Sequence, residues 1–384
     1  MKKFLDCISI VGATPSKFHG TKKYVSTGAV ATTEIDESEV VEVTYEDRPS
    51  RANLSADAGD ILFAKMQGTR KTLLLDSETE KNIYSTGFYA VRANPEVITT
   101  ECLYYLIDSE LFLAQKDKNC SGATQKAITN GGMAKIEISV PALSEQGILV
   151  DKLKHLTQLI ADKKKQLNLF DEIIKSRFIE MFGDPKLNPR KWDMVTIGDI
   201  ATDVRYGTSR PATEGGNYPY LRMNNLTYEG YLDLTDLKHI DIPDNEIEKC
   251  VVRNGDVLFN RTNSVELVGK TCVYNLDSDM IIAGYIIRVR IDDRVLPVIL
   301  SSYLNSTVMK EQLRSMAKGA VNQANINAQE LRSISIYLPP ITLQHEFATF
   351  VEQVDKSKFY IVQMQILLRL LIRAIQQKTT EVLL

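Results

Sequence analysis

Apolar residues recur every three or four positions in two long segments of the chain. They fall at Leu149, Leu153, Leu156, Ile160, Leu167, Phe170 and Ile174 in the first segment, and at Phe347, Val351, Val354, Ile361, Leu368, Ile372 and Ile375 in the second. Steps of four and three place such residues on one stripe of an α-helix, in the pattern of a coiled-coil seam. The sequence therefore predicts two long helices, each with one apolar seam.

Polar residues interrupt the two seams at positions that do not coincide. The first seam contains Lys163, and the second contains Lys358 and Gln365. Two different helices that must choose one register would need such interruptions. Two arrangements are open, because each helix could pack on its own domain or the two could pair, antiparallel, within one chain. The mismatched interruptions favour pairing.

The segments outside the two helices form a repeat of short strands and loops. The run GDILF at 59–63 returns as GDVLF at 255–259, and a strand that ends at Pro141 returns as one that ends at Pro339. Strands are predicted at 61–63, 87–92, 136–140, 219–223, 257–259, 281–291 and 334–338, and helices at 100–116 and 298–318. An α+β fold with pseudo-two-fold symmetry follows from this order.

Four segments divide the chain. Residues 1–142 form the first globular domain, 143–183 the central helix, 184–340 the second domain and 341–384 the C-terminal helix. Gly183 and Pro185 end the central helix, since glycine suits a helix C-terminus and proline cannot continue the helix. The first helix opens with Ser144-Glu145-Gln146 and the second with Thr342-Leu343-Gln344. If the glutamate caps the first helix, the second begins less firmly.

Composition is that of an ordinary globular protein. The chain has 384 residues, of which 44% are hydrophobic and 25% are charged, and a formal net charge of −3. Its start lacks the apolar run of a signal peptide, and the apolar run at 281–287 is too short to span a bilayer, so we expect a cytoplasmic protein without membrane contact. The five cysteines form no CxxC pair, which predicts free thiols and neither a metal nor a cofactor.

The sequence also argues against catalysis. An adenine methyltransferase needs an Asn/Asp-Pro-Pro-Tyr/Phe turn, and the run NYPY at 217–220 has the right residue types in the wrong order. A nuclease needs an acidic-x-Lys motif after Pro-Asp, and the residues after Pro243-Asp244 supply none. The four histidines are dispersed, and no phosphate-binding loop is present. We therefore expect a chain that is not an enzyme.

Several motifs together resemble a known family. These are GDVLFNRT at 255–262, ELVGK at 266–270, Ile326-Asn327 and Leu338-Pro339-Pro340, and they are similar to the target recognition domain of type I restriction-modification specificity subunits, called HsdS. The resemblance extends over the chain, because the order of domain, helix, domain, helix is also that of the family. It implies two target recognition domains that each read one half of a bipartite, asymmetric site in double-stranded DNA.

The resemblance also implies partners. The paired helices would set the gap between the two half-sites and dock two methyltransferase subunits, and the assembly can recruit restriction subunits. Two other interpretations stay open: a coiled-coil scaffold that does not bind DNA, and a recognition fragment of a fused restriction-methylation enzyme. A scaffold would show no salt-dependent binding to duplex DNA.

Polar loops supply the candidate DNA contacts, since Arg and Lys donate to guanine and Asn and Gln pair with adenine. In the first domain they are Lys65, Gln67, Thr69, Arg70, Lys71, Gln125 and Lys126. In the second they are Arg205, Tyr206, Thr208, Arg210, Arg222, Asn224, Asn225, Arg261, Thr262, Asn263, Lys318, Asn322 and Gln323. Each has a structural alternative, because such residues also cap turns or fill a core.

Overall fold

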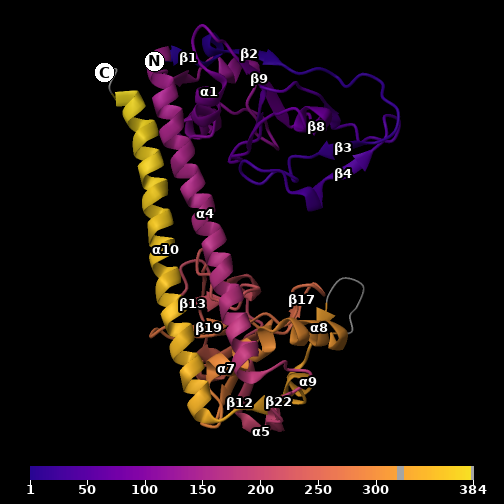
Figure 1. The fold of residues 1–384 in the computed structure, drawn as a ribbon, viewed down its shortest axis with the longest axis vertical. Coiled ribbons are helices and arrows are strands. Elements are labelled where there is room, and N and C mark those ends of the chain that lie inside the picture. Colours follow the sequence, from indigo (N-terminus) through magenta and orange to yellow (C-terminus); the bar gives the residue numbers. More distant parts are fainter. Residues whose placement is uncertain (318–323, 382–384) are drawn as a thin grey trace. The chain divides into compact units, whose positions relative to one another are not determined.

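The computed structural model describes residues 1–317 and 324–381, with side chains in the last helix through Gln377 (Figure 1). The chain divides into two compact units, Met1–Lys164 with Val362–Leu384 and Lys165–Ile361. Both long helices, α4 (Leu143–Phe182) and α10 (Ile341–Glu381), contribute one segment to each unit.

The first unit contains two four-stranded sheets. One has the order β2 (Ile8–Val11), β9 (Phe88–Ala93), β6 (Ile61–Ala64) and β7 (Thr72–Leu74), all antiparallel. The other has the order β4 (Val41–Val43), β3 (Lys22–Val25), β8 (Ile83–Ser85) and β5 (Ala52–Leu54), with β3 and β8 parallel. Strand β1 (Lys2–Lys3) pairs with β10 (Glu137–Ile138). Short helices are α1 (Thr100–Ile107), α2 (Glu110–Lys118), α3 (Asn130–Met133) and 3-10 turns at Phe4–Cys7, Glu37–Glu39 and Thr79–Lys81.

The second unit repeats this topology. Its sheets have the orders β12 (Ala201–Tyr206), β20 (Ile286–Ile291), β16 (Val257–Asn260), β18 (Thr271–Val273), and β14 (Lys238–Ile240), β13 (Tyr218–Leu221), β19 (Met280–Ile282), β15 (Val251–Val252). Strand β11 (Asp193–Thr196) pairs with β22 (Ser335–Leu338), and β17 (Thr262–Asn263) with β21 (Ala324–Asn325). Helices are α5 (Ile197–Ile200), α6 (Asp244–Cys250), α7 (Pro297–Asn305), α8 (Thr307–Met316), α9 (Ala328–Arg332) and a 3-10 turn at Met223–Asn225.

Three predicted elements are each two elements in the structure. The strand predicted at 281–291 is β19 and β20, which belong to different sheets and are joined by a turn at 283–285. The helix predicted at 100–116 breaks before α2, because the Ser109 hydroxyl caps the new helix by accepting from the Phe112 amide. Ser306 does the same between α7 and α8 by accepting from the Met309 amide. A serine at a helix start satisfies an amide that would otherwise lack a partner.

The repeated Gly-Asp pair builds the same turn in both units. Gly59 and Gly255 have φ of 87° and 92°, a conformation that favours glycine. The following carboxylate, Asp60 in unit one, receives the guanidinium of Arg92 at 2.6 Å. Its counterpart Asp256 receives Arg290 at 2.8 Å. A buried carboxylate that pairs with a partly exposed arginine at the same place in each copy gives a structural reason for the repeated motif.

A buried glutamine fixes the start of each long helix to the domain before it. The Gln146 side chain is 0% exposed, accepts from the Thr99 amide at 2.7 Å, and donates to the carbonyls of Val97 and Pro141. Gln344 is also 0% exposed and makes the same three bonds, to the Leu296 amide and to the carbonyls of Arg294 and Pro339. The two helix starts are therefore equivalent, and the exposed Glu145 does not distinguish them.

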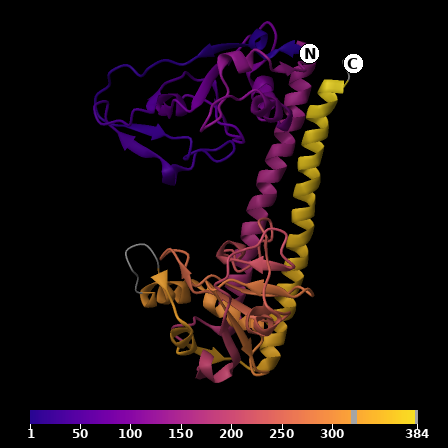
Figure 2. The ribbon, with the colours of Figure 1, turned by 180° about the vertical axis from the view of Figure 1, so that it is seen from behind.

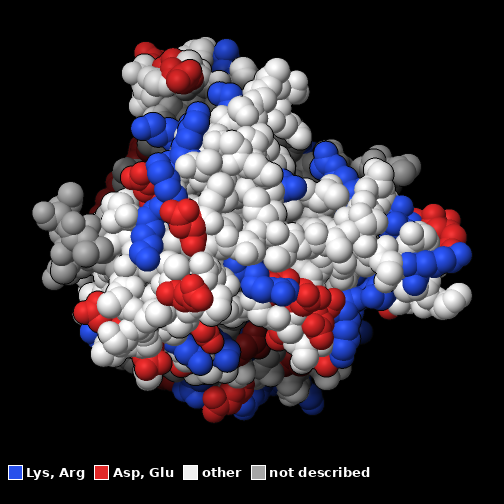
Figure 3. Space-filling model, turned by 90° about the horizontal axis from the view of Figure 1, so that it is seen from above, with Lys and Arg blue, Asp and Glu red and all other residues white. Residues whose placement is uncertain are grey.

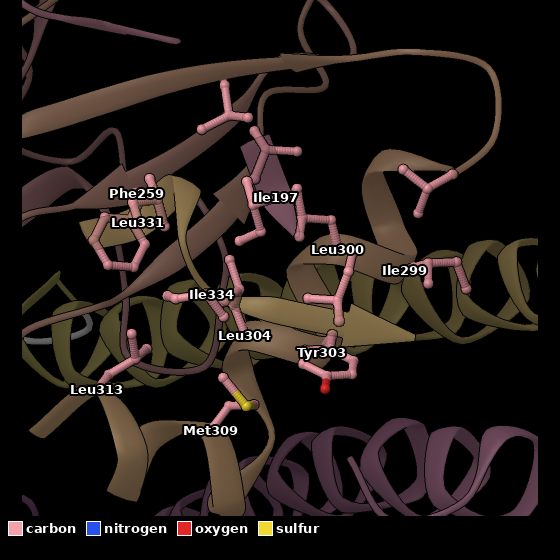
Figure 4. Packing of buried hydrophobic residues seen from close by; sticks show 14 of the residues in the cluster. Ile197, Phe259, Ile299, Leu300, Tyr303, Leu304, Met309, Leu313, Leu331 and Ile334 are labelled. Carbon is pink, nitrogen blue, oxygen red and sulfur yellow. The ribbon is translucent and has the colours of Figure 1, made fainter. Parts of the chain in front are cut away.

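The largest core of the second unit lies between its first sheet and the short helices. Phe259 of β16 belongs to one cluster with Leu300, Tyr303 and Leu304 of α7 and with Met309 and Leu313 of α8 (Figure 4). Phe178 and Phe182 of α4 and Phe347 of α10 also belong to it. Because helical and strand residues share one core, the loops at the strand ends rest on a rigid support.

Segments of α4 and α10 lie side by side within each unit (Figure 2). In the second unit the Phe347 ring lies 5.5 Å from the rings of Phe178 and of Phe182. Lys358 forms an ion pair with Asp171 there, and its ammonium lies 3.7 Å from the Tyr231 ring centroid. In the first unit the Gln365 amide donates to the Ile160 carbonyl at 3.4 Å. Two polar interruptions of the second seam therefore contact α4.

All the predicted seam residues are buried or half-buried. They are Leu149, Leu153, Leu156, Ile160, Leu167, Phe170, Ile174, Phe347, Val351, Val354, Ile361, Leu368, Ile372 and Ile375. Other apolar residues of α10 are exposed, among them Tyr360 at 71% and Leu367 at 65%. Among the described residues, α10 is the one helix with the length and apolar content of a membrane span, which is weak support for such a role.

Candidate nucleic acid interface

Two loops of the first domain that contain predicted contacts meet after strand β6. Met66 forms a β-bridge with Ala127, and the backbone amide of Gln67 donates to the Lys126 carbonyl at 2.9 Å. The side chains of Gln67, Gln125 and Lys126 are exposed there. Residues about sixty positions apart in sequence therefore share one surface.

Of three other candidates of the first domain, two have internal partners and one is half-buried. The Arg70 guanidinium forms an ion pair with Asp108 at 3.0 Å, and burial raises the pKa of that carboxyl although Arg70 opposes the rise. The Lys71 ammonium donates to the Thr27 carbonyl at 2.6 Å. Thr69 is half-buried. Arg70 and Lys71 hold the loop through these contacts, so a role in recognition would require them to change partners.

A buried lysine that the sequence analysis missed holds the same loop. Lys116 of α2 is 2% exposed, and its ammonium donates to the carbonyls of Met66 and Thr69 at 2.8 Å and of Ala64 at 3.3 Å. Phe112 lies four residues earlier on the same buried face of the helix. A lysine at helical spacing from a buried phenylalanine was the available signal.

Segments of the second domain converge on the turn at 283–285. Thr208 forms a parallel bridge with Ala283, whose amide donates to the Leu221 carbonyl at 2.9 Å. The Arg261 amide donates to the Tyr285 carbonyl at 2.9 Å. Three of the predicted segments, at 205–210, 222–225 and 261–263, therefore lie beside this turn or directly follow a residue that does. Tyr285 is 50% exposed and joins the candidates.

Three arginines of this group form ion pairs. Arg205 pairs with Asp203, Arg210 with Glu246, and Arg222 with Asp236, each at 2.7 Å. The hydrogen bond from Arg210 lowers the pKa of Glu246, and the one from Arg222 lowers the pKa of Asp236. DNA phosphates would compete with these carboxylates for the guanidinium groups.

Asn225 and Thr262 are internal and leave the candidate set. Asn225 is 2% exposed. Its side-chain amide accepts from the backbone amide of Arg222 at 2.8 Å and donates to the Asp233 carbonyl at 2.7 Å. The Thr262 hydroxyl donates to the Asn325 side chain at 2.8 Å. Asn263 is half-buried and bonds Asn260, whereas Asn224 is exposed. Lys318, Asn322 and Gln323 lie outside the described residues.

Charge is mixed over the surface. On the face shown in Figure 3, Lys and Arg side chains lie among Asp and Glu side chains and form no continuous basic surface. The ion pairs above and the net charge of −3 agree with this picture. Among the described residues, no group of three or more His, Cys, Asp or Glu side chains could hold a metal ion.

Lys310 of α8 provides a pH-dependent term in stability. Its side chain is 3% exposed and donates to the Gly269 carbonyl at 2.8 Å. Burial, with smaller effects of Lys270 and Arg314, lowers the pKa of Lys310 to about 7. An unfolded lysine keeps its proton to about pH 10.4. Above pH 7 the unfolded chain therefore binds more protons, so the free energy of unfolding rises with pH between about 7 and 10.

Lys310→Met should remove this rise. We expect the wild-type protein to gain up to about 1.4 kcal/mol per pH unit relative to the variant between pH 7 and 9. The Thr271 hydroxyl still donates to the Gly269 carbonyl at 3.1 Å, so the variant keeps one donor there. Urea unfolding at both pH values measures the difference, with the exposed Lys249→Met as control. Parallel pH profiles for wild type and Lys310→Met would contradict the assignment.

Comparisons with known proteins agree with this architecture. The sequence profile described as the type I restriction modification DNA specificity domain matches residues 10–169 and 189–370. The chain is 24% identical over 284 residues to the type I restriction enzyme EcoKI specificity subunit of Escherichia coli K12, covering 70% of this chain and 61% of that protein. It is 29% identical over 171 residues to the putative MjaX specificity subunit of Methanocaldococcus jannaschii, covering 44% of this chain and 40% of that one.

A solved structure shows the same fold. It concerns complex assembly and conformational transition of the type I R-M system, and one of its chains superposes with a TM-score of 0.58 at 23% identity, covering 98% of this chain and 96% of that one. The profile matches both repeats and most of the residues. The chain belongs to the family of type I restriction-modification DNA specificity domains.

Proposed function

We propose that this chain is the DNA specificity subunit of a type I restriction-modification complex and reads a bipartite, asymmetric site. The duplicated domain carries the proposal, because the same pair of sheets appears twice with different loops at the strand ends. After the shared Gly-Asp turn the first domain continues with Ala64-Lys65-Met66 and the second with Asn260-Arg261-Thr262. A constant frame with divergent loops suits the reading of two different half-sites.

The two long helices fit a spacer between the half-sites. Their seam residues are buried or half-buried in each unit, and the pair of Lys358 with Asp171 fixes one register. A polar pair within a seam specifies partner and register more than it adds stability. We infer an antiparallel coiled coil with pseudo-two-fold symmetry. Its pairing residues are the predicted seam positions.

The exposed apolar surface of α10 supports docking of helices from methyltransferase subunits. Tyr360, Leu367, Leu370 and Leu371 are each about half exposed or more. In the second unit a pocket of about 730 Å³ lies between α4, α10, α7 and the loop at 229–232, and it is lined by Phe178, Val351 and Phe359 among others. Exposed apolar surface of this kind marks contact with another protein. Two methyltransferase subunits, with restriction subunits where these are present, would complete a cytoplasmic complex whose chemistry resides in the partners.

Mapping of methylated bases tests the proposal. Cells that express the partner methyltransferase with this chain should show adenine methylation at one bipartite, asymmetric motif, and cells without the chain should lose it. A matched strain with another specificity subunit shows that the methyltransferase is active. No motif in the presence of this chain, together with no salt-dependent duplex binding by the complex, would favour the scaffold interpretation.

A further inference from the structure

One residue position is built identically in the two domains. Lys65 directly follows β6 and Arg261 directly follows β16, and these strands hold the same place in sheets of the same order. The Lys65 amide donates to the Gly87 carbonyl and its carbonyl accepts from the Ile128 amide, both at 2.9 Å. The Arg261 amide donates to Tyr285, and its carbonyl accepts from the Ile326 amide, also at 2.9 Å.

The side chains at this position are also held in the same way. The Lys65 ammonium donates to the Thr86 carbonyl at 2.9 Å, one residue before its backbone partner. An Arg261 guanidinium nitrogen donates to the Gly284 carbonyl at 3.4 Å, again one residue before the backbone partner. Each cation therefore binds the carbonyl at the corresponding point of the turn between two strands.

Each cation also lies over a tyrosine ring. Lys65 is 4.3 Å from the centroid of Tyr89, and Arg261 is 4.8 Å from that of Tyr206. The Tyr89 hydroxyl donates to the side chain of Asn130, the first residue of α3, at 2.8 Å. The Tyr206 hydroxyl accepts from the amide of Ala328, the first residue of α9, at 2.8 Å. The rings come from different strands, so two local solutions support one position.

Neutral groups hold both cations, in contrast with the neighbouring arginines. Arg70, Arg205, Arg210 and Arg222 all pair with carboxylates. Within the described residues neither Lys65 nor Arg261 forms an ion pair, and both side chains are half-buried. The Arg261 Nε is buried and has no hydrogen-bond partner in the described part of the chain. The terminal nitrogens of both side chains can therefore turn to a ligand without displacing an anion.

We propose that this shared position reads guanine in both half-sites, with Lys65 donating to one guanine and Arg261 to another. The inference rests on the proposed function. Guanine presents O6 and N7 as acceptors in the major groove, and Arg or Lys bound to both is the commonest base-specific contact. Tyr89 and Tyr206 are positioning residues, because their rings restrict the direction of the cation.

Single-base substitution of the mapped site tests the inference. The complex of this chain with its methyltransferase is assayed for methylation rate and binding on the wild-type duplex and on duplexes altered at each position. Arg261→Ala should lose roughly tenfold or more in affinity and lose its preference at one G·C pair of one half-site. Lys65→Ala should do the same at one G·C pair of the other half-site only. Arg261→Lys should keep part of the preference.

Controls separate this inference from folding and from the proposed function. Lys135→Ala and Lys249→Ala, exposed in the first and second domains, should behave as wild type. Thermal unfolding of each variant shows whether it has lost structure. If Arg261→Ala is unfolded, the base preference is measured instead with the milder variants Arg261→Lys and Tyr206→Phe. An equal loss on all duplexes with a weaker salt dependence indicates a phosphate contact and overturns base reading. A mapped half-site without a G·C pair overturns it too, while the proposed function stands.

Discussion

Gln344→Ala is expected to lower the free energy of unfolding of the second domain by about 3–5 kcal/mol. The substitution leaves the Leu296 amide and the carbonyls of Arg294 and Pro339 without their buried partner, and each unsatisfied buried group costs about 1–3 kcal/mol. The single tryptophan, Trp192, lies in the same unit and reports its unfolding by fluorescence. Its indole donates to the Phe182 carbonyl at the end of α4.

Gln353→Ala on the same helix is the matched control, because that side chain is exposed. It should change stability by less than about 0.5 kcal/mol. If Gln344→Ala were as mild as its control, the glutamine would not be the anchor of the helix start. The corresponding change at Gln146 should act on the first domain and leave the tryptophan transition nearly unchanged.

Lys116→Met is expected to release the loop that follows β6 in the first domain. The ammonium holds three carbonyls of residues 64–69, and bonds to a charged donor contribute about 1.5–3 kcal/mol each. A loss of roughly 3 kcal/mol or more follows, with faster amide hydrogen exchange at 65–71. If the proposed function holds, the variant in complex with its methyltransferase should lose base discrimination in one half-site and keep it in the other.

Lys118→Met lies two residues further along the same helix, where the side chain is exposed. It removes the same charge without removing a buried donor, and should leave both the loop and the base preference unchanged. Unchanged hydrogen exchange in Lys116→Met would show that other contacts hold the loop.

The sequence predicted the periodic parts of the fold because each depends on local spacing. The seam residues show a helical period, and the repeated Gly-Asp run marks the same strand in both domains. The predicted helix boundaries were wrong where a single side chain decides where a helix ends. Ser109 and Ser306 end one helix and begin another, although the apolar pattern continues across both.

Residue type and loop placement named candidate contacts but could not name their partners. Arg70 meets Asp108 and Arg210 meets Glu246, 38 and 36 positions away, and only the fold brings these groups together. Asn225 is of a residue type that can pair with adenine, yet its side chain is already bonded to the backbone amide of Arg222 and to the carbonyl of Asp233. The repeat aligns Lys65 with Arg261, but their carbonyl and ring contacts involve residues distant in sequence and are visible only in the fold.

Each domain is fastened to the helix that follows it by its own glutamine, and the two sets of anchored residues have no member in common. A substitution in the anchor of one domain therefore leaves the anchor of the other domain untouched. On the proposed function, each domain determines the sequence of one half-site independently of the other domain. The number of complete sites that such chains can read is then the number of different first domains multiplied by the number of different second domains. Exchange of one domain alone gives a new target site.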